Sequence, residues 1–182
     1  MNMTFEALLN STQTLGRHRG PVTGAALVPG QQQVVTSAYD GAVGLFDLQS
    51  GGAALLGYHR HLVNSVTVDP AGRRAASCSS DYNTCIWDPQ TGTAQRTLLG
   101  HADDVEVFLF IGNDTGVSAS RDRRIMVWDL TTGAIENILE GHEKDVLALA
   151  YHDGKLYSSG DDMTLRVWDL ASGRLLNTWG AF

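Results

Sequence analysis

A set of three residues recurs at regular intervals along this chain: a histidine, a hydroxyl residue and an aspartate. These are the residue types that carry out catalysis in many hydrolases. In one instance His142 is followed by Ser158 and then by Asp162. Serine, histidine and aspartate form the nucleophilic triad of many hydrolases. They can equally form a buried hydrogen-bond chain, in which a carboxylate and a hydroxyl satisfy the two imidazole nitrogens. The number of copies of the set distinguishes these interpretations.

The set occurs four times, and each copy ends on an aromatic residue. Its members are His18, Thr36, Asp40 and Phe46; His59, Ser77, Asp81 and Trp87; His101, Ser118, Asp122 and Trp128; and His142, Ser158, Asp162 and Trp168. A nucleophile needs one reactive site with an oxyanion hole, which four equivalent copies do not provide. We therefore predict structural roles for these residues and no catalytic residue, and we expect the chain not to be an enzyme.

The regularly spaced histidines also argue against a metal site. Each has its own carboxylate and hydroxyl partner within its repeat, and His59 and His61 form an isolated His-x-His pair without a third ligand nearby. The sequence contains no glycine-rich motif for holding phosphate. We expect neither a metal nor a cofactor.

Short β-strands must position these residues. In the last repeat, segments rich in β-branched and aromatic residues cover 146–151, 155–159, 165–168 and 175–179, and Gly and Asp turns separate them. The aromatic residues that end the four sets are about 41 residues apart, which is the period of a repeated four-stranded unit. The pattern predicts an all-β chain of four antiparallel units.

These markers resemble the WD40 (β-transducin-like) repeat family. The pair Gly100-His101, the run Ser-Ser-Gly-Asp-Asp at 158–162 and the run Val-Trp-Asp at 167–169 match its signature. The resemblance covers 16–182 and implies four β-propeller blades, at about 16–56, 57–99, 100–140 and 141–182. Residues 1–15 would be an N-terminal extension or an extra outer strand.

The resemblance implies that each set is the structural tetrad of its blade. In such a tetrad the carboxylate accepts from one imidazole nitrogen, the other nitrogen accepts from the hydroxyl, and the hydroxyl oxygen accepts the indole N–H. Phe46 has no N–H, so the first tetrad lacks its outermost donor. This loss costs about 1 kcal/mol and predicts that blade 1 is the least stable.

Composition excludes several classes of protein. The chain has 182 residues, a net charge of -7, 43% hydrophobic and 18% charged residues, as expected for a folded domain. The excess of acids argues against nucleic acid as a partner, and no apolar run approaches the roughly 20 residues of a membrane span. The first residues lack the basic region of a signal peptide. We expect Cys78 and Cys85 to be buried thiols, which suits a cytoplasmic protein.

The resemblance also implies a partner-binding surface on the narrow top face. It assigns three positions per repeat to this face: three and five residues after the histidine, and the residue before the turn aspartate. These are Pro21, Thr23, Tyr39, Leu62, Asn64, Ser80, Asp104, Glu106, Arg121, Asp145, Leu147 and Asp161.

The charge on this surface is unevenly distributed. Its positions in blades 3 and 4 hold four acids and one arginine, whereas those in blades 1 and 2 are neutral and partly apolar. Clustered acids attract basic partners and accelerate encounter. We hypothesise that the top face binds a basic peptide or protein segment, with Tyr39 and Leu62 as apolar anchors. The alternative is that the acids serve only solubility.

Four blades are too few to close a ring in a family whose propellers commonly have seven or eight. Each end blade would expose a face of roughly 300 Å² in projection, for four strands about 4.8 Å apart and five residues long. Two such faces need a cover. The simplest cover is a second copy, giving an eight-bladed ring with two-fold symmetry in which blade 4 of each chain meets blade 1 of the other. There are two alternatives. A partner protein could supply the missing blades, or this chain could be a segment of a longer propeller.

The leading functional interpretation is a non-catalytic scaffold for protein–protein interaction. A second is a structural subunit or propeller fragment whose open blades complete a larger assembly. A third, a ligand-binding or enzymatic propeller with a site in the central channel, has little support because the predicted innermost strands carry Glu106 and few other ionisable groups.

Overall fold

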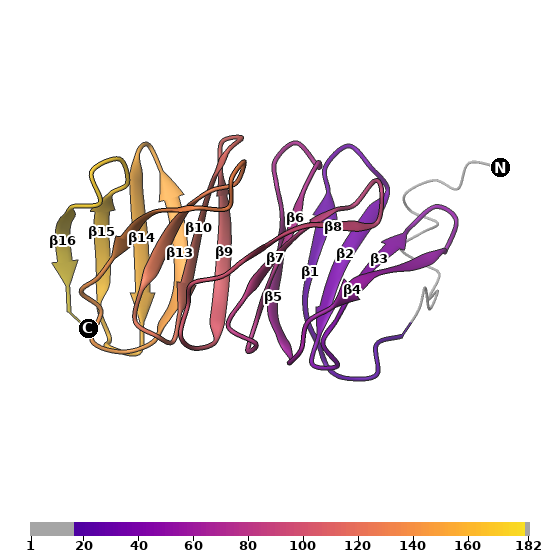
Figure 1. The fold of residues 1–182 in the computed structure, drawn as a ribbon, viewed down its shortest axis with the longest axis horizontal. Coiled ribbons are helices and arrows are strands. Elements are labelled where there is room, and N and C mark those ends of the chain that lie inside the picture. Colours follow the sequence, from indigo (N-terminus) through magenta and orange to yellow (C-terminus); the bar gives the residue numbers. More distant parts are fainter. Residues whose placement is uncertain (1–16, 181–182) are drawn as a thin grey trace.

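The computed structural model describes residues 17–180, so the expected extra strand within 1–15 lies outside the described residues. Within that range, sixteen strands form four four-stranded antiparallel sheets, each from four consecutive strands. Figure 1 shows the sheets in a row, with the N-terminal and C-terminal sheets at opposite ends. No helix among these residues is long and apolar enough to cross a membrane. The prediction of an all-β fold with four four-stranded antiparallel units is confirmed.

We number the sheets as blades 1 to 4 in chain order. Blade 1 contains β1 (Val22–Val28), β2 (Gln33–Ala38), β3 (Ala42–Asp47) and β4 (Ala53–Tyr58), and blade 2 contains β5 (Val63–Val68), β6 (Ala75–Ser79), β7 (Thr84–Asp88) and β8 (Thr93–Leu98). Blade 3 contains β9 (Val105–Ile111), β10 (Thr115–Ser120), β11 (Ile125–Asp129) and β12 (Ile135–Leu139), and blade 4 contains β13 (Val146–His152), β14 (Lys155–Gly160), β15 (Leu165–Asp169) and β16 (Leu175–Trp179). The boundary predicted at residue 56 falls inside β4, which continues to Tyr58 because Tyr58 still pairs with Ala42.

Neighbouring blades are joined by apolar cores between their facing sheets. Successive side chains of a strand point to opposite faces. Each inner blade therefore packs one set of residues against the blade before it and another set against the blade after it. The face toward the preceding blade is the leading face, and the opposite one is the trailing face. The first core joins Val35 and Leu56 of blade 1 to Val63 and Trp87 of blade 2, and the same arrangement recurs at the next two junctions.

Both cysteines belong to these cores. Cys78 and Cys85 are free and buried, in the second and first junction cores respectively. Burial raises the pKa of Cys78 to about 12 and also raises the pKa of Cys85. A thiol that stays protonated at neutral pH is a poor nucleophile and metal ligand, so both cysteines act as packing residues.

Candidate functional site

The predicted tetrad residues of blades 2, 3 and 4 lie within hydrogen-bond distance of one another. In blade 3, His101 Nδ1 is 2.8 Å from Asp122 Oδ2, and its Nε2 is 2.8 Å from Ser118 Oγ. The Trp128 indole N–H donates to the same hydroxyl at 2.8 Å. Blades 2 and 4 repeat these bonds at 2.7 to 3.0 Å. Each hydroxyl therefore connects an imidazole to an indole, so the imidazole, hydroxyl and indole groups of these three tetrads are all paired.

Blade 1 forms a shorter version of this hydrogen-bond chain. His18 Nε2 lies 2.7 Å from Thr36 Oγ1, but its Nδ1 is 3.4 Å from Asp40 Oδ1. The Phe46 ring stands 6.2 Å from the imidazole, close to the 6.3 to 6.4 Å of the His–Trp pairs. Phe46 thus occupies the place of the indole without donating a hydrogen bond.

Burial governs the protonation of these tetrads. It lowers the pKa of His59 and His142, although their aspartate partners oppose the shift. Burial alone would raise the pKa of Asp162, but hydrogen bonds from Thr164, the Glu143 N–H and His142 lower it to about 2. Each of these tetrads therefore holds a neutral imidazole against an ionised carboxylate.

The aspartate that follows each aromatic residue has a role that the sequence reasoning missed. In blade 3, Asp129 Oδ1 accepts hydrogen bonds from the backbone N–H of Thr131 and Thr132, and both hydroxyls also donate to its carboxylate. These bonds lower the pKa of Asp129 to about 2. The aspartate forms an Asx turn that leads into the outer strand. The hydroxyl residues and the glycine that recur after this aspartate could have indicated the turn.

Two of the three predicted top-face positions in each blade are joined by a backbone hydrogen bond. In every blade, the N–H of the residue before the turn aspartate donates to the carbonyl of the residue three after the histidine. These bonds are Tyr39 to Pro21, Ser80 to Leu62, Arg121 to Asp104 and Asp161 to Asp145, at 2.9 to 3.1 Å. We call the twelve predicted top-face residues the top rim.

The arginine of the top rim is surrounded by carboxylates from two blades. Arg121 Nε donates to Glu106 Oε1 and lies 3.9 Å from both Asp104 Oδ2 and Asp145 Oδ2. The hydrogen bond that Arg121 donates to Glu106 raises the pKa of Arg121. The Ser80 hydroxyl donates to Asp104 at 2.7 Å, so the polar contacts run from blade 2 to blade 4. Asp161 is exposed at the far end.

Two rim residues point sideways toward the next blade. The Thr23 hydroxyl donates to the carbonyl of Val63 at 2.7 Å, and the Asn64 amide donates to that of Val105 at 2.9 Å. Both side chains thus join blades and are less available to a partner. The equivalent residue of blade 4, Leu147, has no donor and is exposed.

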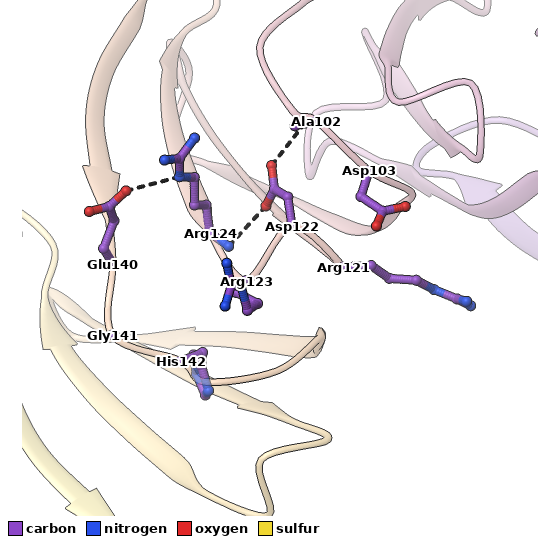
Figure 2. Close-up of a pocket in the computed structure, with 9 residues that line it drawn as sticks. All are labelled: Ala102, Asp103, Arg121, Asp122, Arg123, Arg124, Glu140, Gly141 and His142. Carbon is purple, nitrogen blue, oxygen red and sulfur yellow. Dashed lines mark hydrogen bonds and ion pairs between the residues drawn. The ribbon is translucent and has the colours of Figure 1, made fainter.

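Two hollows open beside the rim. The first, of about 310 Å³, lies between blades 1 and 2 and brings together the two predicted anchors, Tyr39 and Leu62. The second, of about 530 Å³, lies between blades 3 and 4. Figure 2 shows Arg124 paired with Glu140 on one side of it, 2.9 Å apart, while the Arg121 side chain extends away. Of the three arginines that flank Asp122, Arg121 and Arg124 therefore pair with carboxylates.

A second polar link at the opposite end of the strands was also missed. Asp69 is buried and accepts hydrogen bonds from the backbone N–H groups of Arg73 and Arg74. The Arg74 guanidinium lies 5.5 Å from the ring centre of Phe110 and donates to the carbonyl of Asn113 in blade 3. These residues follow β5 in blade 2 alone, so the repeat pattern gave no signal for them. Among residues 17–180, no group of three His, Cys, Asp or Glu side chains is arranged to hold a metal.

The family model "WD domain, G-beta repeat" matches the chain at 9–47, 54–88, 92–129 and 133–169. The chain therefore belongs to the WD40 family, and the predicted number of four repeats is confirmed. The second, third and fourth matches run through an outer strand and the first three strands of the next blade. The sequence repeat and the sheet are therefore out of phase by one strand.

Two of the curated relatives match nearly the whole chain and a third matches a short segment of it, and all three are much longer. "Nuclear distribution protein PAC1-1" of Uncinocarpus reesii is 34% identical over 170 residues, which cover 89% of this chain and 38% of the relative. "Cell division control protein 4" of Candida albicans is 36% identical over 173 residues, covering 93% and 25%. "Nucleoporin SEH1" of Caenorhabditis briggsae is 51% identical over 35 residues, covering 19% and 10%. The chain thus spans less than two fifths of the length of these relatives.

Proposed function

We propose that this chain is a non-catalytic interaction scaffold whose top rim binds a basic segment of a partner protein. Membership of the WD40 family and similarity to relatives named for nuclear distribution, cell division and the nucleoporins support the scaffold role. The free, buried thiols support a reducing compartment such as the cytoplasm. The basic partner is argued from the rim itself.

The observation that carries this proposal is the environment of Arg121. Glu106, Asp104 and Asp145 converge on its guanidinium from blades 3 and 4, so this part of the rim already binds a cationic group within the chain. Three carboxylates against one guanidinium leave an excess of negative charge, to which the exposed Asp161 adds. A partner lysine or arginine would complete the neutralisation that Arg121 begins.

The apolar end of the rim supplies the second half of the site. Tyr39 is exposed at the mouth of the hollow that Leu62 also lines. Buried aromatic anchors surrounded by polar contacts are the usual centre of a binding hot spot. A partner segment would therefore place an apolar residue near Tyr39 and basic residues near Asp145.

Charge reversal on the rim tests this proposal. We expect Asp104→Lys with Asp145→Lys to weaken binding of a panel of lysine- and arginine-rich peptides at least tenfold, and wild-type binding to weaken as salt rises. The matched control is Asp114→Lys with Glu136→Lys, which makes the same change in net charge at exposed positions outside the rim. Equal affinity in the rim variant and the wild type would show that the acids serve solubility alone.

The open ends of the blade row support a second candidate function, completion of a ring by self-association. Val22 and Leu27 are exposed on the leading face of blade 1, as are Leu147 and Leu165 on the trailing face of blade 4. A two-fold dimer of eight blades would cover both faces. Light scattering should then give about 39.2 kDa, twice the 19.6 kDa of one chain, and a stable monomer would defeat it. Blades supplied by another protein or by a longer chain are the alternatives.

A further inference from the structure

The leading face of blade 1 and the trailing face of blade 4 are the two halves of a junction that occurs three times within the chain. At each internal junction a leucine of the outer strand belongs to the core that contains the tryptophan of the next blade. These leucines are Leu56, Leu98 and Leu139. The internal junctions therefore show which residues would meet if the two open faces came together.

Blade 4 carries a larger residue at the leucine position. Leu98 and Leu139 stand eleven positions after their tryptophans, and Trp179 stands eleven positions after Trp168. Leu98 and Leu139 are 1% and 2% exposed, whereas Trp179 is 46% exposed. It ends β16, and its indole lies on a sheet face that no other blade among residues 17–180 covers.

Blade 1 carries smaller residues at the receiving positions. Phe46 replaces the tryptophan, and Gly44 stands two positions before it, where blade 3 has Met126. A Cβ on Gly44 would lie 3.1 Å from the Phe46 ring, so the ring lies directly over the glycine. Beside them is a cavity of about 390 Å³, also lined by Ala54, Leu55 and Tyr58. A cavity of roughly 150 Å³ holds a benzene molecule, so this one has room for an indole.

We propose that Trp179 of one copy inserts into the Gly44–Phe46 cavity of a second copy. The inference rests on the self-association proposed above and names the contact that holds it. The larger residue on one open face compensates for the smaller residues on the other, so the bulk at the new junction resembles that of the pair Leu98 and Met126 within the chain.

The size of the interface is consistent with such a dimer. A ring of two copies contains two identical junctions, each of roughly 300 Å² in projection per face. Each copy then contributes roughly 600 Å² in projection, and corrugated side chains raise the accessible area toward the ~800 Å² per partner of a standard interface. A buried tryptophan at the centre of each junction is a typical hot spot.

The test compares dimer dissociation constants by sedimentation equilibrium. Trp179→Ala should raise the constant at least 30-fold, as for the loss of a hot-spot residue. Gly44→Met should do the same, because the new side chain pushes the Phe46 ring into the cavity. Gly44→Met with Trp179→Leu recreates the Leu98–Met126 pair, and we expect it to recover most of the lost affinity. Leu55→Glu, at an exposed position of the cavity wall, is the second blocking variant in case Gly44→Met does not fold.

Mixing the single variants gives an independent readout. Trp179→Ala retains an open cavity and Gly44→Met retains the tryptophan, so a 1:1 mixture should form heterodimers with one intact junction more tightly than either variant self-associates. A monomeric wild type would overturn both the self-association and this contact. A wild-type dimer with the same constant in Trp179→Ala would overturn the contact alone.

Discussion

Blade 1 and blade 3 have the same strand order and the same tetrad positions, but only blade 3 is enclosed. Val105 of blade 3 is fully buried against blade 2, whereas Val22, its equivalent in blade 1, is 58% exposed. The His101–Asp122 contact is 2.8 Å, and the corresponding contact of His18 with Asp40 is 3.4 Å. The Phe46 ring is half-buried where Trp128 is buried.

The difference indicates that the blade before a tetrad helps to enclose it. The aromatic residue and the hydroxyl lie on the leading face, so the preceding blade excludes water from them. Without that cover a hydrogen bond competes with solvent and contributes less to stability. Among residues 17–180 no blade stands before blade 1, and Phe46 supplies no indole donor. We therefore expect blade 1 to be the least stable.

The largest expected contrast lies between the two tetrad hydroxyls. Ser118→Ala leaves His101 Nε2 and the Trp128 N–H without a partner in a buried site, and should lower the free energy of unfolding by about 3 kcal/mol. Thr36→Ala removes the hydrogen-bond partner of His18 Nε2 alone, so it should lower the free energy of unfolding by about 1 kcal/mol. Urea unfolding of both variants measures the difference. Equal losses would mean that burial by the preceding blade does not strengthen the tetrad.

The next contrast lies between the two equivalent valines. Val105→Ala opens a cavity between blades 2 and 3 and should cost about 2 kcal/mol. Val22→Ala removes exposed atoms, so its effect on a monomer should stay within about 0.5 kcal/mol. Thermal unfolding at a concentration where the chain is monomeric makes the comparison. A large loss for Val22→Ala would show that blade 1 is covered by another part of the chain.

The smallest effect is expected from repairing the first tetrad. Phe46→Trp supplies the missing N–H to the Thr36 hydroxyl and should raise the free energy of unfolding by about 1 kcal/mol. The measurement belongs in the Trp179→Ala background, so that self-association does not contribute. Phe46→Leu is the control for a change of apolar packing that adds no donor. No gain from Phe46→Trp would mean that exposure, and not the missing donor, weakens blade 1.

The sequence by itself determined the repeat, the strands and the members of each tetrad. These features lie within one repeat, where alternation of apolar residues and turn residues dictates a strand and its orientation. The order His101, Ser118, Asp122, Trp128 was sufficient to indicate one hydrogen-bond chain. The weakness of the first tetrad also follows from the sequence, because the chemistry of Phe46 excludes a donor.

Only the tertiary structure decided which rim residues are free and which join blades. Thr23 and Asn64 bond to the backbone of the next blade, and Arg121 contacts acids of two blades. Such contacts form between repeats, so they depend on how sheets pack and not on the pattern within one repeat. The match between Trp179 and the cavity beside Phe46 is of the same kind, because the exposure of both residues depends on which blade stands beside them.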